Sequence, residues 1–329
     1  MRIDIHSHFL DMDFIRHLEG RPERPTSYQE NGAYFVDCAP GLTHGSGPRI
    51  VNMDIKLREM ELMGIDVSVL SPGMPGPECL NPGAPEEADY WASRINDYLA
   101  GLIDAHPGKF LGWGTLGYGD ADRTIAEADR CVRELGFKGF QLYSNVGGSV
   151  IDQPAFLGVY EHVATLGVPL NIHPTIPLNL VGMDTHGLIS GLGYMYDTSL
   201  ALVRLLGAGV FDQSPSLKLI MPHVGGIVPY LQGRISRRPL TNAKGTLASY
   251  LAMVNYDTVT YDLAALEYCF AFAGAERLLY GTDVPFTDAI PAADALVERL
   301  DCTEAERELI YHGNAERLLG IEAWSGITT

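Results

Sequence analysis

Cysteine is scarce in this sequence and no cysteine motif is present. Its five cysteines, among 329 residues, are an odd number and contain no CxxC pair. Such a set gives no disulfide framework, so we expect free thiols in a reducing compartment. A cysteine nucleophile is the alternative, but no neighbouring motif supports it.

Long hydrophobic runs are missing as well. No uninterrupted apolar stretch approaches the roughly 20 residues that a membrane-spanning helix needs. The N-terminus is interrupted at once by Asp4 and His6, which argues against a signal peptide. We therefore expect a cytoplasmic protein with no membrane partner.

Positive charge is in short supply. The 23 lysine and arginine residues stand against 41 aspartate and glutamate residues, which gives a formal net charge of −18. A surface of this sign repels the phosphates of nucleic acids, so no nucleic-acid partner is expected. An anionic substrate would need local positive charge from a metal ion or from arginine side chains.

Strand-like and helix-like segments alternate along the chain. Short apolar segments bounded by glycine, proline or polar residues predict strands at 2–8, 66–71, 110–116, 139–143, 169–173, 217–223, 258–262 and 278–283. Intervening segments predict helices near 53–63, 86–106, 120–135, 154–166, 197–211, 225–237, 263–274 and 288–299. Eight such units favour an α/β fold, a (β/α)8 TIM barrel. A doubly wound open sheet is the competing fold.

Three stretches depart from the alternation. Residues from about 10 to 52 are rich in proline, glycine and polar side chains, and we expect a small insertion there after the first strand. Residues 174–196 resemble a glycine-rich loop, and 303–320 predict C-terminal helices. Because loops after the strands build the active site of a barrel, the insertion should cover the pocket. No linker divides the chain, so 1–329 is expected to be a single domain.

Histidine or aspartate stands at the ends of several predicted strands. His6 and His8 lie near the end of the first strand, His173 ends the fifth, and Asp283 ends the eighth. Imidazole and carboxylate groups on separate strand ends can converge on one divalent cation. Convergence of this kind favours the barrel over the open sheet, so we predict that these four side chains bind a metal.

The alternation of side chains along a strand gives a more specific expectation for the first strand. His6 and His8 are two residues apart, so both should point to the same face. By the same rule, Ile3 and Ile5 should point to the opposite face.

His223, at the end of the sixth predicted strand, is the candidate acid–base group. An imidazole pKa can lie near the working pH, as proton transfer requires. A fifth metal ligand is its alternative role, and Asp283 could hold a water molecule or move a proton. His17, His44 and His186 lie in or near loops of the same end of the barrel, where one of them could touch substrate.

The whole pattern resembles the amidohydrolase superfamily, and more closely its aminocarboxymuconate-semialdehyde decarboxylase branch. The similar segments are 3–8, 58–61, 112–116, 131–139, 173–174, 209–211, 217–218, 223–236, 281–286 and 313–315. The resemblance implies a metal role for His6, His8, His173 and Asp283, a catalytic role for His223, and no organic cofactor.

The number of metal ions follows from one missing residue. Binuclear members of the superfamily carry a carboxylated lysine at the end of the fourth strand, and the segment 139–143 contains no lysine. We therefore predict one divalent metal. Nitrogen-rich ligation favours zinc, with manganese or iron possible.

Two arginines are expected to bind the substrate. By resemblance, Arg234 matches an arginine that grips the substrate carboxylate across a subunit boundary, which implies a homodimer. It lies 11 residues beyond His223, or about 16 Å along a helix, too far to reach its own metal. Arg49 is the nearest match to a second such arginine, although it stands two residues out of place. Thr175 also departs from the family pattern, which has tryptophan there, so the particular acid stays open.

The resemblance implies a metal-dependent, non-oxidative decarboxylase that acts on an aromatic or muconate-like carboxylic acid with activated water and a histidine acid–base group. The alternative is a hydrolase or hydratase with the same ligands, acting on a C–C bond, a lactone or an unsaturated acid. A third interpretation is a barrel that binds a small carboxylic acid without turnover. The complete set of catalytic residue types argues against it.

Overall fold

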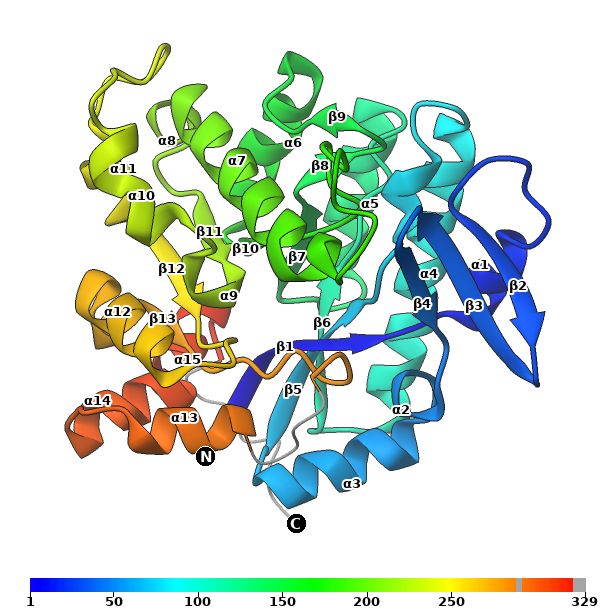
Figure 1. Ribbon diagram of the computed structural model, residues 1–329, viewed down its shortest axis with the longest axis horizontal. Coiled ribbons are helices and arrows are strands. Elements are labelled where there is room, and N and C mark those ends of the chain that lie inside the picture. The colour runs from blue at the N-terminus through cyan, green and yellow to red at the C-terminus, as the bar shows by residue number, and fades with distance from the viewer. Residues whose placement is uncertain (288–291, 322–329) are drawn as a thin grey trace.

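Eight parallel strands form the centre of the computed structural model, which describes residues 1–287 and 292–321. They are β1 (Ile3–Phe9), β5 (Val67–Pro72), β6 (Phe110–Gly114), β7 (Gly139–Tyr143), β10 (Pro169–His173), β11 (Lys218–Met221), β12 (Val254–Asp257) and β13 (Leu278–Leu279), in this spatial order. Backbone hydrogen bonds from Ile5 to Tyr280 and from His8 to Val284 join the first strand to the last. The sheet is thus a closed (β/α)8 barrel, as predicted (Figure 1).

Helices surround the barrel (Figure 1). The longer ones are α3 (Met53–Met63), α4 (Pro85–Ala105), α5 (Ala121–Arg133), α6 (Pro154–Leu166), α7 (Tyr194–Gly207), α10 (Val228–Ile235), α12 (Leu263–Ala273) and α13 (Ala292–Arg299). Helix α5 begins where the Asp120 side chain accepts a hydrogen bond from the Arg123 amide, and it buries Thr124, Ala128 and Cys131. Among the described residues, no helix is long and apolar enough to cross a membrane.

Short helical segments connect the larger elements. They are α1 (Met12–His17), α2 (Pro48–Val51), α8 (Val210–Gln213), α9 (Pro222–Gly225), α11 (Leu247–Leu251), α14 (Glu304–Glu308) and α15 (Asn314–Leu319). Residues 288–291, where the predicted helix near 288–299 was expected to begin, lie outside the described ranges. The stretch predicted as a loop at 174–196 becomes helical earlier than expected, because a π-helical turn at Ile189–Gly193 runs directly into α7.

The stretch predicted as an insertion carries a three-stranded antiparallel sheet of β2 (Thr26–Glu30), β3 (Ala33–Ala39) and β4 (Leu42–Gly45). It stands at one edge of the molecule beside α1 (Figure 1). The Ser27 amide donates a hydrogen bond to the carbonyl of Leu18, which fixes the sheet to the end of α1. Val36 and Cys38 are buried, so one face of this sheet packs against the rest of the protein.

Apolar side chains from five strands fill the lower interior of the barrel. Trp113 is fully buried there, and its indole N–H donates to the carbonyl of Ile5 at 2.8 Å. A Cβ on Gly139 would stand 2.4 Å from the Trp113 ring, so only glycine lets strand β7 approach it. Ala315 and Leu319 of the C-terminal helix belong to the same cluster, which they close from below.

A β-bulge in β1 corrects the expectation for Ile3 and Ile5. The register with β5 runs from Asp4 opposite Ser68 to Ser7 opposite Leu70, so β1 contains one extra residue between them. Ile3 and Ile5 pack in the interior cluster with Trp113. Because the bulge resets the alternation, the side chains of His6 and His8 also point inward, higher in the barrel, and the predicted opposite orientation is wrong.

The seventh strand lies earlier than predicted. The structure places it at Val254–Asp257, paired with β11, and not at 258–262. Polar and apolar residues alternate over 254–257 and again over 258–262, so the pattern permits a strand at either position. Pairing with β11 decides the position, and it puts Asp257 at the carboxyl end of the strand.

Candidate metal centre and active site

The four predicted metal ligands come together at the carboxyl ends of the strands. One nitrogen or oxygen atom from each of His6, His8, His173 and Asp283 lies within 4.8 Å of the others, and all four residues are buried. The Nε2 atoms of His6 and His8 lie 3.4 Å and 3.1 Å from Oδ1 of Asp283. Strands β1 and β10 and the segment after β13 thus supply the group.

Each of the three imidazoles is held through Nδ1. The pairs are His6 with Oδ2 of Asp257 at 2.7 Å, His8 with Oγ of Ser71 at 3.0 Å, and His173 with the carbonyl of Pro174 at 2.8 Å. Such partners fix the ring and its tautomer, which leaves the Nε2 lone pair for a ligand. Nε2 of His6 is buried without a hydrogen-bond partner. Three imidazole nitrogens and one carboxylate around a common point fit a single divalent metal.

The four side chains shift one another's pKa values. Burial opposes protonation of His6, but the carboxylates of Asp283 and Asp257 outweigh it and raise the His6 pKa to about 9. Burial lowers the pKa of His8 to about 4 and that of His173 well below its ordinary value. Although burial alone would raise the pKa of Asp283, the nearby histidines hold it well below the usual range. The group therefore favours one positive charge beside Asp283.

His223 lies beside this group in a strained turn. Strand β11 ends at Met221, and His223 and Val224 adopt left-handed conformations with φ of 55° and 49°. Such backbone strain in residues with a Cβ is concentrated at functional sites. Nε2 of His223 lies 3.4 Å from Oδ2 of Asp283, whereas His8 lies beside the other oxygen, Oδ1. The imidazole can therefore exchange a proton with a molecule held next to Asp283.

Asp257 is a candidate functional residue that the sequence alone did not reveal. Its Oδ1 accepts hydrogen bonds from the amides of His223 at 2.7 Å and of Val259 at 3.0 Å, while Oδ2 holds His6. One buried carboxylate thus orients a predicted metal ligand and fixes the turn of the acid–base candidate. An earlier boundary for the seventh strand would have drawn attention to Asp257, since it would then have ended a strand as His173 does.

A roof of aromatic side chains covers the centre. The ring of Phe286 lies 5.3 Å from His8 and 5.8 Å from His44, and Nε2 of His44 lies 3.2 Å from the hydroxyl of Tyr194. The insertion and α7 therefore meet above the predicted ligands. Of the three loop histidines considered, only His44 lies here.

His17 and His186 lie elsewhere. His17 pairs with Glu87 at 3.1 Å, and His186 is exposed. These observations give neither histidine a place at the predicted metal ligands.

The two arginines expected to bind substrate are placed differently. Arg49 is half-buried, with Nε 2.5 Å from Glu59 and guanidinium N–H groups directed to the carbonyls of Pro285 and Thr287. It therefore holds the segment that follows Asp283. Arg234 is exposed near the end of α10.

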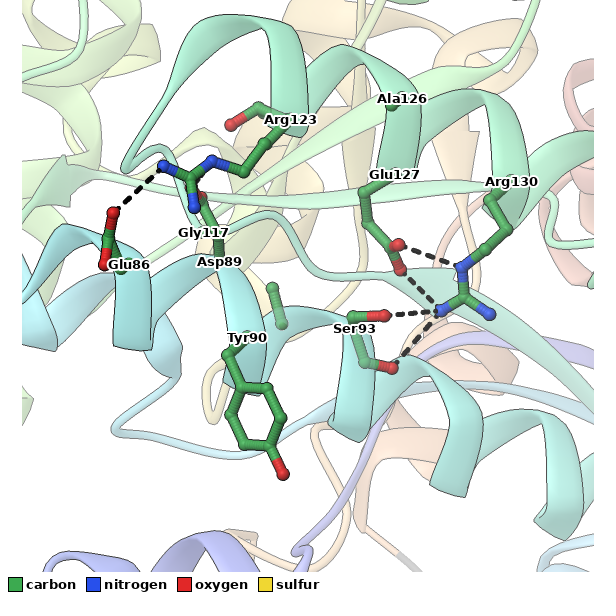
Figure 2. A pocket seen from close by; sticks show the side chains of 11 residues that line it. Glu86, Asp89, Tyr90, Ser93, Gly117, Arg123, Ala126, Glu127 and Arg130 are labelled. Carbon is green, nitrogen blue, oxygen red and sulfur yellow. Dashed lines mark hydrogen bonds and ion pairs between the residues drawn. The ribbon is translucent and has the colours of Figure 1, made fainter.

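A separate groove of about 360 Å³ lies between α4 and α5 (Figure 2). Its arginines are already paired, Arg123 with Glu86 at 3.5 Å and Arg130 with Glu127 at 2.8 Å. None of the predicted site residues lines it. We assign no ligand to this groove.

The closed barrel and the buried histidine–aspartate group define a metal-binding (β/α)8 protein. A family model described as amidohydrolase matches residues 3–321, and the chain belongs to this family. The resemblance inferred from the sequence is thereby confirmed.

Proteins of known activity resemble the chain over most of its length. It is 28% identical to 2-amino-3-carboxymuconate-6-semialdehyde decarboxylase of Dictyostelium discoideum, over 98% of this chain and 92% of that one. It is 29% identical to 2-keto-4-carboxy-3-hexenedioate hydratase of Sphingobium, over 80% and 81%. A crystal structure of dihydroxybenzoic acid decarboxylase from Polaromonas, with manganese and 2-nitroresorcinol, superimposes with a TM-score of 0.84 at 26% identity, over 100% and 99% of the two chains.

Proposed function

We propose that this protein is a metal-dependent, non-oxidative decarboxylase of an aromatic or muconate-like carboxylic acid. The observation that carries the proposal is the convergence of His6, His8, His173 and Asp283 with His223 beside them. Decarboxylases of such acids are among the relatives of the chain. The acid would enter beneath the Phe286 ring, which offers an apolar face to a planar substrate.

His6, His8, His173 and Asp283 would hold one divalent ion. Zinc suits three imidazoles and a carboxylate, and manganese is the alternative because a related structure contains it. When bound, the ion supplies positive charge that polarises the oxygen atoms of the substrate.

The proton chemistry falls to His223 and Asp283. We propose that a proton passes from this pair to the carbon that bears the carboxylate. The bond between that carbon and the carboxylate then breaks, its electrons restore the conjugated system, and CO2 leaves. Proximity supports this pairing, since Nε2 of His223 and Oδ2 of Asp283 lie 3.4 Å apart. Arg49 and Arg234 are the proposed cations for substrate carboxylates.

A hydratase or hydrolase is the second candidate, supported by the hydratase among the relatives. Both chemistries need a metal, a water molecule and one acid–base group. They differ in the fate of the water oxygen, which a hydratase or hydrolase transfers to its product and a decarboxylase does not.

The deciding experiment supplies the zinc- or manganese-loaded protein with hydroxy-, amino- and oxo-substituted aryl and muconate acids in ¹⁸O-labelled water. We expect loss of CO2 without ¹⁸O in the organic product, read by mass spectrometry. Incorporation of ¹⁸O with the carbon count kept, or with a C–C cleavage fragment, would contradict decarboxylation and support the second candidate.

We further propose that the active unit is a homodimer in which Arg234 enters the neighbouring site. The exposed position of Arg234 on α10 supports this. His223→Ala and Arg234→Ala should each lower turnover by about 100-fold or more when the two sites of a dimer carry the same change. Mixed dimers contain one site with both residues intact, so mixing the variants should restore up to about a quarter of the wild-type activity. No recovery, with subunit exchange shown by mass, would contradict action across the boundary.

A further inference from the structure

A buried carboxyl group beside the metal centre has no part in the chemistry above. Glu78 lies in the short 3-10 helix Pro77–Leu80 after β5 and is 1% exposed. One of its oxygens, Oε1, lies 2.7 Å from the hydroxyl of Thr175, two residues beyond His173. The other oxygen, Oε2, is buried without a hydrogen-bond partner. Buried polar atoms without a hydrogen-bond partner are rare and energetically costly. We therefore expect a bound molecule to form a hydrogen bond with this oxygen.

Tyr143 directs a second polar atom to the same place. It is the register partner of His173 across β7 and β10, so its side chain also points into the barrel, next to the predicted ligand. Its hydroxyl is buried and makes no hydrogen bond of normal geometry, although Gln141 and Thr115 lie near enough to work against the rise in its pKa that burial causes. The Tyr143 hydroxyl and Oε2 of Glu78 lie 2.0 Å and 2.5 Å from the point that a Cβ on Gly76 would occupy. The two unpaired oxygens therefore converge.

Further unpaired oxygens surround this pair. They belong to Thr115, Tyr118 and Gln141. Tyr118 and Tyr143 both lie near enough to Glu78 for its charge to raise their pKa beyond the effect of burial. Hydroxyl, amide and carboxyl groups thus gather near Tyr143, and each presents one oxygen that lacks a hydrogen-bond partner.

The charge state of Glu78 limits what can bind there. Within 1–287 and 292–321, no lysine or arginine forms an ion pair with it. Burial raises its pKa to about 8, although hydrogen bonding from Thr175 and from the backbone at Gly76 and Glu78 works against this. Near neutral pH Glu78 therefore carries a proton and can donate a hydrogen bond. A second carboxylate would find no cation here, whereas a neutral oxygen would find donors and acceptors.

We propose that Glu78 and Tyr143 form a subsite, adjoining the metal centre, for a neutral oxygen substituent of the substrate, a hydroxyl or oxo group remote from the carboxylate. This inference rests on the proposed function, because it assumes that an acid lies at the metal centre. It narrows the substrate class to acids that carry an additional uncharged oxygen.

The test compares the binding of inert probes. A nitro group can occupy the place of a carboxylate but cannot leave as CO2. The probes are therefore 2-nitrophenol and its derivatives with one more hydroxyl meta or para to the nitro group, namely 3-nitrocatechol, nitrohydroquinone and 4-nitroresorcinol. Their Kd values are measured by calorimetry on the manganese-loaded wild type and on Glu78→Gln, Glu78→Leu and Tyr143→Phe. At least one hydroxylated probe should bind the wild type about tenfold more tightly than 2-nitrophenol, the worth of one well-formed buried hydrogen bond.

The variants should separate a binding role from a structural one. Glu78→Gln keeps a donor and should retain the advantage of the hydroxylated probe, whereas Glu78→Leu and Tyr143→Phe should lose it and leave 2-nitrophenol unchanged. Equal affinity of all probes for the wild type, or an equal loss for all probes in both of those variants, would overturn the subsite. Because no probe releases CO2, failure here is distinct from failure of the decarboxylase proposal, which the isotope experiment reads separately.

Discussion

At the residue scale, one carboxylate contacts both a proposed metal ligand and the acid–base candidate. Asp257 accepts from the His223 amide through one oxygen and holds His6 through the other. It therefore fixes both the orientation of the His6 imidazole and the strained turn at His223. A buried group with two such contacts is a positioning residue in the sense used for outer-shell partners of metal ligands.

Replacing Asp257 with Asn should weaken metal binding by about 10- to 100-fold, the usual cost of losing an outer-shell partner. The amide keeps the size of the side chain but can no longer offer two accepting oxygens. Competition with a chromogenic chelator measures the affinity. Asp197→Asn is the matched control, since Asp197 is equally buried and holds Ser144 and Asn145. Equal metal affinity in the two variants would contradict the positioning role.

The four proposed ligands and His223 could be singled out from the sequence because each residue type is unusual at the end of an apolar strand. The convergence of His6, His8, His173 and Asp283 follows from the closed sheet. Asp257 could not be found in the same way, because the alternating segment around it admits two strand positions. Pairing with a distant strand selects one of them, and that information is absent from any local pattern.

The loop after β5 shows how an element can depend on one small residue. Gly76 precedes the 3-10 helix that carries Glu78, and its missing side chain leaves room for the Tyr143 hydroxyl. The proposed subsite therefore depends on close contact between this loop and strand β7.

Gly76→Ala should lower the free energy of unfolding by about 1–3 kcal/mol, because the added methyl group would overlap Tyr143. Gly158→Ala, in the middle of α6, is the control. Nothing lies within 4 Å of its new Cβ, and alanine favours a helix over glycine by about 0.5–1 kcal/mol, so this change should stabilise the protein. Urea unfolding measures both. A Gly76→Ala protein as stable as the wild type would show that the loop can move away from β7.

Most elements could be placed from periodicity and bounding residues, and their order implied the barrel. Two features of individual elements could not be predicted from the sequence. The extra residue in β1 leaves no mark in the hydrophobic pattern of the sequence. It is seen only in the register between β1 and β5. The early start of α7 depends on the π-helical turn before it, in a segment where Gly187, Gly191 and Gly193 favour a loop locally.

For the whole molecule, buried acidic groups make stability depend on pH. The pKa of Glu78 rises from 4.5 to about 8 on burial, and that of Asp4 rises from 3.8 to about 6. Between its two values, each group keeps its proton in the folded protein and loses it in the unfolded chain. The folded state then binds more protons, so the unfolding free energy falls as pH rises.

The contribution of Glu78 can be isolated by difference. The unfolding free energy of the wild type, minus that of Glu78→Gln, should decrease between pH 4.5 and about 8, with a steepest slope of about 1.4 kcal/mol per pH unit. Effects of Asp4 and of the histidines cancel, because both proteins share them. Urea unfolding at pH 5, 6, 7 and 8 gives the values. A difference that stays constant with pH would mean that Glu78 ionises in the folded protein as it does in water.

The bulge in β1 has a consequence for anyone who would transplant this centre into another barrel. A designer who copies His6-Ser7-His8 onto a regular strand, together with Ile3 and Ile5, would turn either the imidazoles or the isoleucines outward. The extra residue must be copied as well, with Asp4, whose carboxylate accepts from the amides of His6 and Thr282 and so secures the irregular backbone. The smallest set of residues that could be transferred is therefore the bulged strand together with the segment after β13 that binds Asp4. This set is larger than the three-residue motif.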